Sequence, residues 1–151
     1  MPNYDINTIL SHKNSIILID NIVEYNEEEL FLISEITIND KNIFFDSAIN
    51  GVPACVGIEF MMQTISCYSY LKCNNPAEMV KFLLGAKLMN LAVDKFENGK
   101  TYAIKVKESF TNKEIVAFDC MIYSEGGEEL ASSTVSVYQG DDIEQFLKQN
   151  G

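Results

Sequence analysis

VPACVGIEFMMQ, residues 52–63, opens the longest helix that the sequence predicts, and it is apolar nearly throughout. Pro53 suits the first turn of a helix, where the N–H that proline lacks would have no intrahelical partner. The helix should run from about residue 54 to residue 72 and end before Pro76, which cannot extend it. Its apolar side chains do not fit a single stripe, so we expect the rest of the chain to wrap around it.

The segments around this helix have the composition of β-strands. Residues 15–38 predict two strands joined by a polar NEEE turn, because β-branched and apolar residues dominate both arms. Four more strands are predicted after the helix, at residues 80–93, 101–110, 114–124 and 129–139. We expect residues 80–93 to be buried along much of their length, and we expect hairpin turns at the NG and GG pairs that separate the later strands.

Short helices are predicted at residues 4–10 and 141–150, although the second segment also suits a frayed tail. With 151 residues, no repeat and no linker, the chain is most simply a single domain, 1–151. The expected fold class is α+β, with an antiparallel sheet of five to six strands wrapped around one long central helix.

Charge and targeting signals limit the partners of the chain. The formal net charge is −11 and all 11 basic residues are lysines, which argues against nucleic acid and anionic membrane, because both bind clustered cations. No signal-peptide layout and no apolar run long enough to span a bilayer occur. The four cysteines form no CxxC pair, which suits reduced thiols. We therefore expect a cytoplasmic protein.

Glu59 is the residue of the long helix that packing alone does not explain. Its helical neighbours are apolar except for Gln63, and a buried carboxylate is costly unless it is paired, protonated or hydrated. Desolvation disfavours the charged form of a carboxyl group, which suits a general acid or base that works near neutral pH. Gln63 and Ser66 share the face of Glu59. The polar side chains of this face either bond to one another or cap nearby backbone groups. Alternatively, the amide group of Gln63 orients the Glu59 carboxylate.

The start of the helix offers a second functional element. The first N–H groups of a helix have no internal partner and lie at the positive end of its dipole. The N–H groups of Ala54 and Cys55 are therefore candidate donors to a carbonyl oxygen that gains negative charge. The small residues Ala54 and Gly57 would let a ligand chain approach. Donors at the helix start and a carboxylate one turn further along suit proton removal next to a thioester carbonyl.

PACVGIEFMMQ, residues 53–63, resembles the central-helix motif P-G-C-L-G-[LI]-[DE]-x-M-x-Q of the hotdog-fold β-hydroxyacyl-ACP dehydratases of bacterial fatty-acid synthesis. LSHKNSIILIDNIVEY (10–25) resembles the opening L-P-H-R-x-P-[FM]-L-L-[VI]-D-R-[VI] of that family, and NIFFD (42–46) resembles its F-F segment. FLLGAKLMNLAV (82–93) resembles the strand that follows the helix. The combination is most similar to the dehydratase subfamily of aryl polyene biosynthesis.

The resemblance implies a hotdog fold, in which a sheet wraps a long helix, and a dimer with acyl tunnels between its subunits. It also implies a catalytic pair, formed by a helix carboxylate of one subunit, here Glu59, and a histidine of the other. Ala54 stands where the family's glycine donates its N–H to the thioester carbonyl. The resemblance places four further residues beside the substrate: Cys55, Gly57, Gln63 and Phe45.

One departure concerns the histidine. In the family it follows F-F in a G-H-F-P-G loop, whereas Phe44 and Phe45 lead here into DSAINGVP, which has no histidine. The only histidine is His12. It either orders the N-terminal segment or reaches the active site as the second catalytic residue, or a paralogous subunit supplies the histidine instead. The altered loop also offers polar residues that suit either substrate contact or an ordinary turn, namely Asp46, Ser47 and Asn50.

The sequence therefore favours a (3R)-hydroxyacyl-ACP dehydratase of fatty-acid or polyene-type synthesis, which eliminates water from a 3-hydroxyacyl thioester. The alternatives are an acyl-thioester hydrolase of hotdog fold and a non-catalytic acyl-binding subunit of a heteromeric dehydratase. The expected partners are an acyl carrier protein or a CoA thioester, and a second hotdog subunit in a homodimer or heterodimer. We expect no metal and no cofactor. Because carrier proteins are usually acidic, docking would need a local lysine patch, for which Lys13, Lys81, Lys87 and Lys95 are candidates.

Overall fold

The computed structural model describes residues 4–11, 17–73, 82–112, 114–138 and 148. The elements in chain order are α1 (Ile6–Ser11), β1 (Asn21–Asn26), β2 (Phe31–Thr37), β3 (Gly51–Pro53), the 3₁₀ turn η1 (Ala54–Val56), α2 (Gly57–Cys73), β4 (Phe82–Leu91), β5 (Lys95–Glu97), β6 (Thr101–Asn112), β7 (Ile115–Tyr123) and β8 (Glu129–Tyr138).

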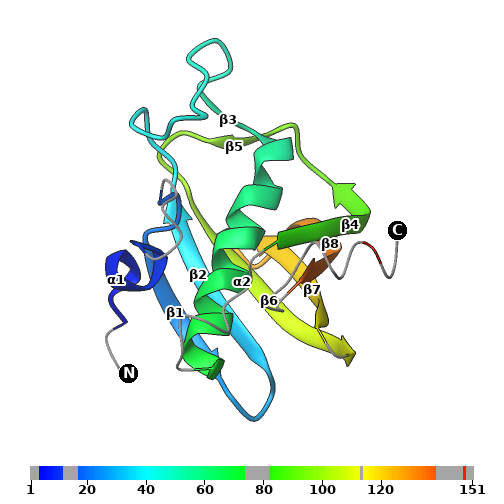
Figure 1. Cartoon of the computed structure of the whole chain (residues 1–151). Helices are drawn as coiled ribbons and strands as arrows, with labels where there is room; N and C mark the ends of the chain where they lie inside the picture. The colour runs from blue at the N-terminus through cyan, green and yellow to red at the C-terminus, as the bar shows by residue number, and fades with distance from the viewer. Residues whose placement is uncertain (1–3, 12–16, 74–81, 113, 139–147, 149–151) are drawn as a thin grey trace.

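Six strands form one antiparallel sheet in the order β1-β2-β6-β7-β8-β4, and α2 lies against one face of it (Figure 1). The short strands β3 and β5 pair with each other beside the start of α2. A long helix wrapped by an antiparallel sheet is the hotdog arrangement, so the predicted fold class is confirmed.

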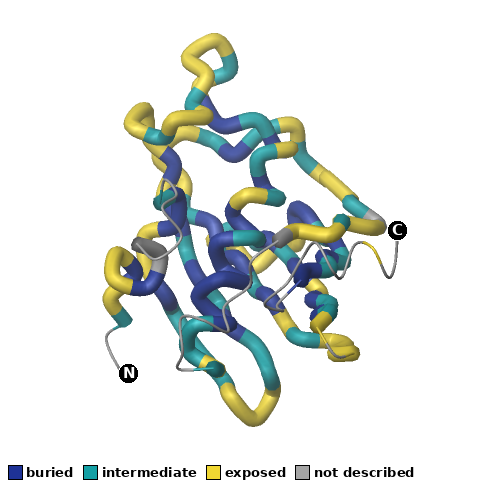
Figure 2. The backbone as a smooth tube through the Cα atoms, in the orientation of Figure 1, coloured by how far each residue is buried: buried dark blue, intermediate teal, exposed yellow. Residues whose placement is uncertain are grey.

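The core lies between α2 and the concave face of the sheet. Strands β6, β7 and β8 alternate between buried and more exposed positions along much of their length, as expected where one face of an antiparallel sheet is covered. A buried contact of 2.7 Å between Ser34 Oγ and Thr64 Oγ1 ties the helix to β2. The middle of α2, residues 63–69, is buried, while its first turn includes exposed and half-buried residues (Figure 2). Its last turn, residues 70–73, is also half-buried or exposed.

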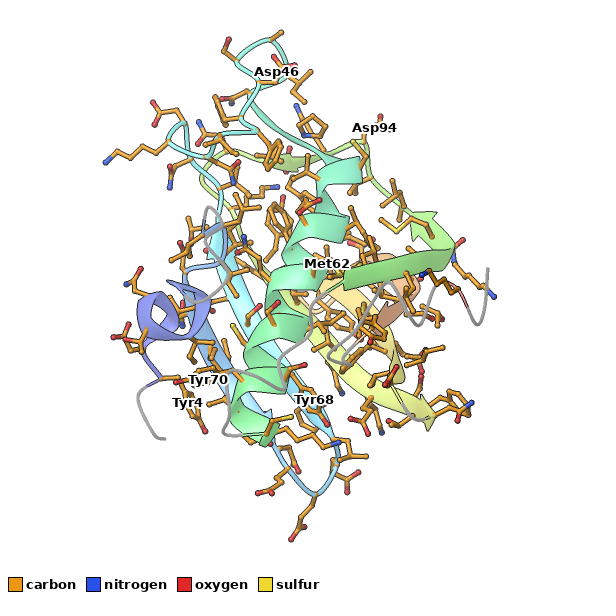
Figure 3. The ribbon with its side chains drawn as sticks, viewed as in Figure 1. Tyr4, Asp46, Met62, Tyr68, Tyr70 and Asp94 are labelled. Carbon is orange, nitrogen blue, oxygen red and sulfur yellow. The ribbon has the colours of Figure 1, made fainter. Side chains whose placement is uncertain are left out.

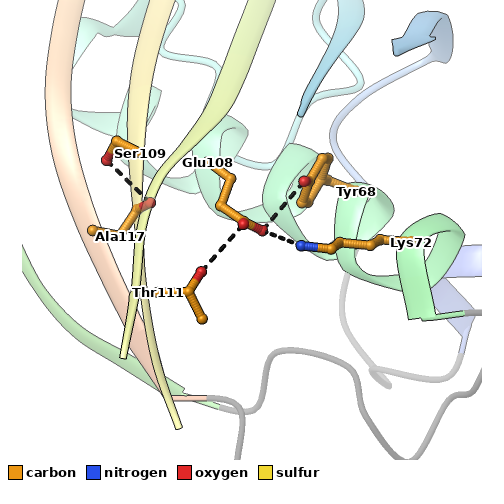
Figure 4. Close-up of polar contacts among 6 residues, drawn as sticks. All are labelled: Tyr68, Lys72, Glu108, Ser109, Thr111 and Ala117. Atoms are coloured by element: carbon orange, nitrogen blue, oxygen red, sulfur yellow. Dashed lines mark hydrogen bonds and ion pairs between the residues drawn. The ribbon is translucent and has the colours of Figure 1, made fainter. Parts of the chain in front are cut away.

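Glu108 on β6 holds the end of α2 that lies furthest from Glu59. Its carboxylate accepts hydrogen bonds from the Tyr68 hydroxyl at 3.2 Å, from the Lys72 ammonium at 2.6 Å and from the Thr111 hydroxyl at 3.2 Å (Figure 4). Burial and the adjacent Glu108 charge raise the pKa of Tyr68, so its hydroxyl stays protonated and donates at neutral pH. These contacts fasten the C-terminal turns of the helix to the sheet.

Most predicted elements are confirmed, and two expectations need correction. The first strand begins at Asn21, because the backbone of Leu18 and Ile19 bonds to a side chain of α2 instead of a ladder partner. The strand predicted at residues 80–93 is β4, but it is an edge strand and much of it is exposed. The predicted turns are present, with φ of 84° at Gly99 and 85° at Gly127. The proposed terminal helix lies outside the described residues, except for Lys148.

Candidate functional site

The start of α2 is positioned by the small sheet of β3 and β5. Val52 pairs with Phe96 in that sheet, and the Ala54 N–H donates a hydrogen bond to the carbonyl of Asp94 at 2.9 Å. Asp94 lies beside the first turns of the helix (Figure 3). The donor of Ala54 is therefore engaged within the chain, and the expectation that it is free to bind a thioester carbonyl is not met. Cys55, the next residue of this turn, is exposed and remains the better candidate donor.

Gly57 has a packing role that the sequence did not reveal. A Cβ at this position would lie 3.0 Å from Ile122 Cδ1 and 3.3 Å from Phe96 Cζ. The residue is buried, so its small size lets the helix approach the core. Gly57 therefore allows close packing of α2 on β5 and β7, and its contact with a ligand chain stays a prediction.

Glu59 lies in the first turn of α2 and is exposed within the chain. The expectation of a carboxylate buried by its own chain is wrong, because the sheet covers a different face of the helix. Cys55 lies four residues before Glu59 and Met62 lies three residues after it, so both share its helical face. Ile58 borders the same face, because it lies three residues after Cys55 and four residues before Met62. All three are exposed or half-buried. We call these four residues the open stripe.

Gln63 fastens the N-terminal segment to the helix. Its Oε1 accepts hydrogen bonds from the N–H of Leu18 at 2.8 Å and from that of Ile19 at 3.4 Å, and its side chain is buried. Ser66 donates to the carbonyl of Met62 at 3.1 Å. Backbone bonding therefore describes Ser66 and the Oε1 atom of Gln63, and a contact between the Gln63 amide group and Glu59 stays a prediction. His12 lies outside the described residues.

The loop before β3 is built from ordinary turn contacts. Asp46 Oδ1 accepts from the Ala48 N–H at 2.9 Å, and Asn50 Oδ1 accepts from the Asn98 side chain at 3.0 Å. Asp46 lies on the part of the loop that projects beyond the start of α2 (Figure 3). Phe45 packs partly against the core, while Phe44 is exposed. These contacts favour a turn-forming role for Asp46 and Asn50 over substrate contact.

The open stripe brings together a carboxylate, a thiol and apolar side chains at the positive end of a helix dipole. The N–H groups of this turn favour a carbonyl oxygen that gains negative charge, and Glu59 lies one turn further along for proton transfer. Glu59 is exposed in the part of the chain that the structure describes. Chemistry that needs a water-poor environment therefore requires a second surface over the stripe.

We expect the thiol of Cys55 to react with a maleimide much faster than the thiols of Cys67 and Cys120. Cys55 is exposed, whereas the other two are buried, and burial raises the pKa of Cys67 to about 12. A time course of labelling followed by peptide mass spectrometry would measure the three rates. Cys55→Ser should remove the fast phase. Rapid labelling of Cys67 in the folded protein would contradict the packing of α2.

Residues 4–148 match the family described as ApeP dehydratase. The chain belongs to the ApeP dehydratase family. Membership agrees with the resemblance found in the central-helix motif and covers nearly the whole chain. A comparison with curated protein sequences gives no significant match.

Solved structures share the fold at low sequence identity. The dehydratase heterocomplex ApeI:P from Xenorhabdus doucetiae matches with a TM-score of 0.79 and 17% identity over 99% of this chain and 100% of that chain. A hypothetical thioesterase with coenzyme A from Streptococcus pneumoniae TIGR4 matches with a TM-score of 0.66 and 9% identity, over 91% and 98% of the two chains. The E. coli PaaI protein from the phenylacetic acid degradation operon matches with a TM-score of 0.63 and 10% identity, over 88% of each chain. Among the described residues of this chain, no helix is long and apolar enough to cross a membrane.

Proposed function

We propose that this ApeP-family chain is one subunit of a dehydratase that removes water from a (3R)-hydroxyacyl thioester carried by an acyl carrier protein. The observation that carries the proposal is the placement of Glu59 among half-buried apolar side chains at the positive end of α2. Glu59 is the only carboxylate of that helix. The family match supports dehydratase chemistry, and the acyl carrier is our own assignment.

The proposed reaction needs two proton transfers. A histidine removes the proton from the carbon next to the thioester carbonyl, while the Cys55 N–H stabilises the negative charge on the carbonyl oxygen. The carbon–oxygen bond at position 3 breaks as the double bond forms. Protonated Glu59 donates to the leaving hydroxyl, which departs as water. Return of the proton from imidazolium to carboxylate restores the site.

A second hotdog subunit completes this site in the proposal. The open stripe is exposed or half-buried, and edge strand β4 exposes apolar side chains that a protein surface rarely gathers: Leu83, Leu84 and Leu91. The outer edge of β4 pairs with no other strand among the described residues, so it suits addition of a strand from another subunit. The histidine comes either from that subunit or from His12. The ApeI:P structure is a dehydratase heterocomplex, which favours a paralogous partner over a second copy.

The test is mass spectrometry of a 3-hydroxyacyl carrier protein incubated with the chain alone and with a co-purified paralogous hotdog subunit. Loss of water in the complex, but not with either subunit alone, is the expected result. Loss of water with this chain alone would replace the heterodimer by a self-sufficient enzyme that uses His12. No loss of water in any combination would overturn the dehydratase assignment.

Thioester hydrolysis is the second candidate, because a helix carboxylate next to N–H donors would also suit activation of water at a thioester carbonyl. The same experiment separates the two reactions. Hydrolysis releases a free 3-hydroxy acid and an unloaded carrier, whereas dehydration leaves an enoyl group on the carrier. Free acid as the main product would favour the hydrolase.

A further inference from the structure

The convex face of the sheet carries three lysines in two adjacent rows, in a chain that is strongly acidic as a whole. Residues directly opposite each other in an antiparallel ladder project to the same face. One row across the sheet contains Lys107 on β6, Asp119 on β7, Thr134 on β8 and Lys87 on β4. Lys105 belongs to the adjacent row. Val106 between the two lysines is buried, which places Lys105 and Lys107 on the outer face.

A hollow of about 360 Å³ opens between these rows. It is lined by Lys105, Lys107, Asp119, Ser132, Thr134 and Asn90, among others. The Thr134 hydroxyl bonds to Asp119 at 3.3 Å, and the Lys105 ammonium lies 4.5 Å from the centre of the Phe31 ring. Within these two rows, from β2 to β4, the charged residues are three lysines and one aspartate, although the whole chain has a net charge of −11. Lys87 belongs to the row of Asp119 but does not line the hollow itself, and Glu35 and Glu129 lie in the next row of the same face. We call this surface the lysine hollow.

We propose that the lysine hollow is the docking surface for the acidic carrier protein that delivers the thioester. This inference rests on the proposed function for the identity of the partner. A strongly acidic subunit repels an acidic carrier on average, so binding requires a locally positive surface, and the hollow provides one. The exposed amide group of Asn90 and the half-buried hydroxyl groups of Ser132 and Thr134 suit a polar interface with carboxylates.

Other occupants fit the hollow less well. The chain has no arginine for bidentate phosphate capture, and the lysines project from strands and not from a helix start, so a small phosphate lacks a built site. Three lysines on a chain of charge −11 are too few to hold nucleic acid. An acidic protein surface needs only complementary charge spread over a broad face.

The position of the lysine hollow suits delivery of the carrier-bound thioester to the open stripe. Lys87 and Asn90 lie on β4, the edge strand that we propose to pair with the second subunit. Asn90 is four residues from Asp94, whose carbonyl bonds to the first turn of the helix. Four extended residues span about 14 Å at most. A carrier docked on the hollow would therefore lie near the edge of the sheet that leads to the start of α2.

Lys95, one of the lysines proposed from the sequence, takes no part in this surface. Lys95 donates from its ammonium group to the carbonyl of Ile49 at 2.6 Å and lines a different hollow. Lys13 and Lys81 lie outside the described residues. Of the two described candidates, Lys87 and Lys95, Lys87 belongs to this surface.

The direct test is a fluorescence anisotropy titration of a labelled holo acyl carrier protein with the chain at low ionic strength. Lys105→Glu and Lys107→Glu should each weaken binding about tenfold, because each reverses a charge that faces the acidic partner. Asp119→Asn should tighten binding about threefold, and raised salt should weaken it. Lys41→Glu, an exposed lysine on a different loop, is the charge-matched control and should bind like the wild type.

Folding is checked for every variant by thermal unfolding, and Lys107→Gln serves as a milder second variant. Equal binding by wild type and both reversal variants would overturn the docking surface. So would equal weakening by Lys41→Glu, since that would mean that only the net charge matters.

Turnover of a 3-hydroxyacyl pantetheine thioester, which lacks the carrier protein, separates this inference from the proposed function. The lysine variants should leave that turnover unchanged in the active preparation. If the lysine variants lower turnover equally with the pantetheine thioester and with the carrier-bound thioester, the lysines affect the catalytic site itself. That result would overturn the docking surface. If neither substrate loses water, the proposed function fails, while the titration still decides whether the hollow binds an acidic carrier.

Discussion

Glu59→Gln is expected to lower the rate of water loss from a 3-hydroxyacyl carrier protein by about 100- to 10,000-fold, the range that a positioned acid or base contributes. Glutamine keeps the size of the side chain and its hydrogen-bonding capacity but cannot deliver the proton to the leaving hydroxyl. The measurement is the initial rate by mass spectrometry in the preparation that dehydrates, at saturating and at limiting substrate.

The effect should fall on kcat and leave the fold intact. Glu59 is exposed within the chain, so its substitution should change the free energy of unfolding by no more than about 0.5 kcal/mol. Glu114→Gln, at an exposed glutamate in the turn between β6 and β7, is the matched control and should retain the full rate. A Glu59→Gln enzyme with wild-type turnover would remove the carboxylate from the mechanism.

His12→Ala extends the same experiment to the histidine. A loss as large as that of Glu59→Gln would assign His12 to the reaction, whereas full activity would point to a histidine of the second subunit. The pair of variants thus separates the two arrangements that the sequence left open.

The architecture was predictable because its signals are local. A helix that is apolar on all sides has to be surrounded by other elements, which predicted a sheet around it. The alternation of Tyr102, Ile104 and Val106 correctly predicted that β6 has one buried face. Turn residues with positive φ correctly separated the later strands. Such patterns depend on neighbours in the chain, which one sequence displays in full.

The contacts of the candidate site were less predictable because they join distant segments. The acceptor of the Ala54 N–H is the backbone carbonyl of Asp94, and any residue type supplies such a carbonyl. Gln63 bonds to Leu18 and Ile19, which lie more than 40 residues away. Glu59 was expected to be buried since its neighbours are apolar, but those neighbours do not reveal which face the sheet covers. The exposure of β4 has the same cause, because an edge position depends on strand order.

Phe96→Ala should destabilise the protein by about 3–5 kcal/mol, the usual cost of truncating a fully buried phenylalanine. Phe96 is fully buried on β5, where its ring lies 5.5 Å from that of Phe60 on α2 and 5.0 Å from that of Tyr102 on β6. Its edge would also lie 3.3 Å from a Cβ atom placed at Gly57. The substitution therefore leaves a cavity beneath the first turn of the helix.

Chemical denaturation followed by far-ultraviolet circular dichroism would measure the change. Phe110→Ala is the matched control, because Phe110 is 58% exposed on β6 and its truncation should cost no more than about 0.5 kcal/mol. Domains of ordinary stability have about 5–15 kcal/mol in total, so Phe96→Ala should remain folded only at low denaturant or low temperature. Where it folds, it should also dehydrate more slowly, since Phe96 supports the turn that carries Cys55 and leads to Glu59. Equal destabilisation by the two truncations would contradict the packing of β5 beneath α2.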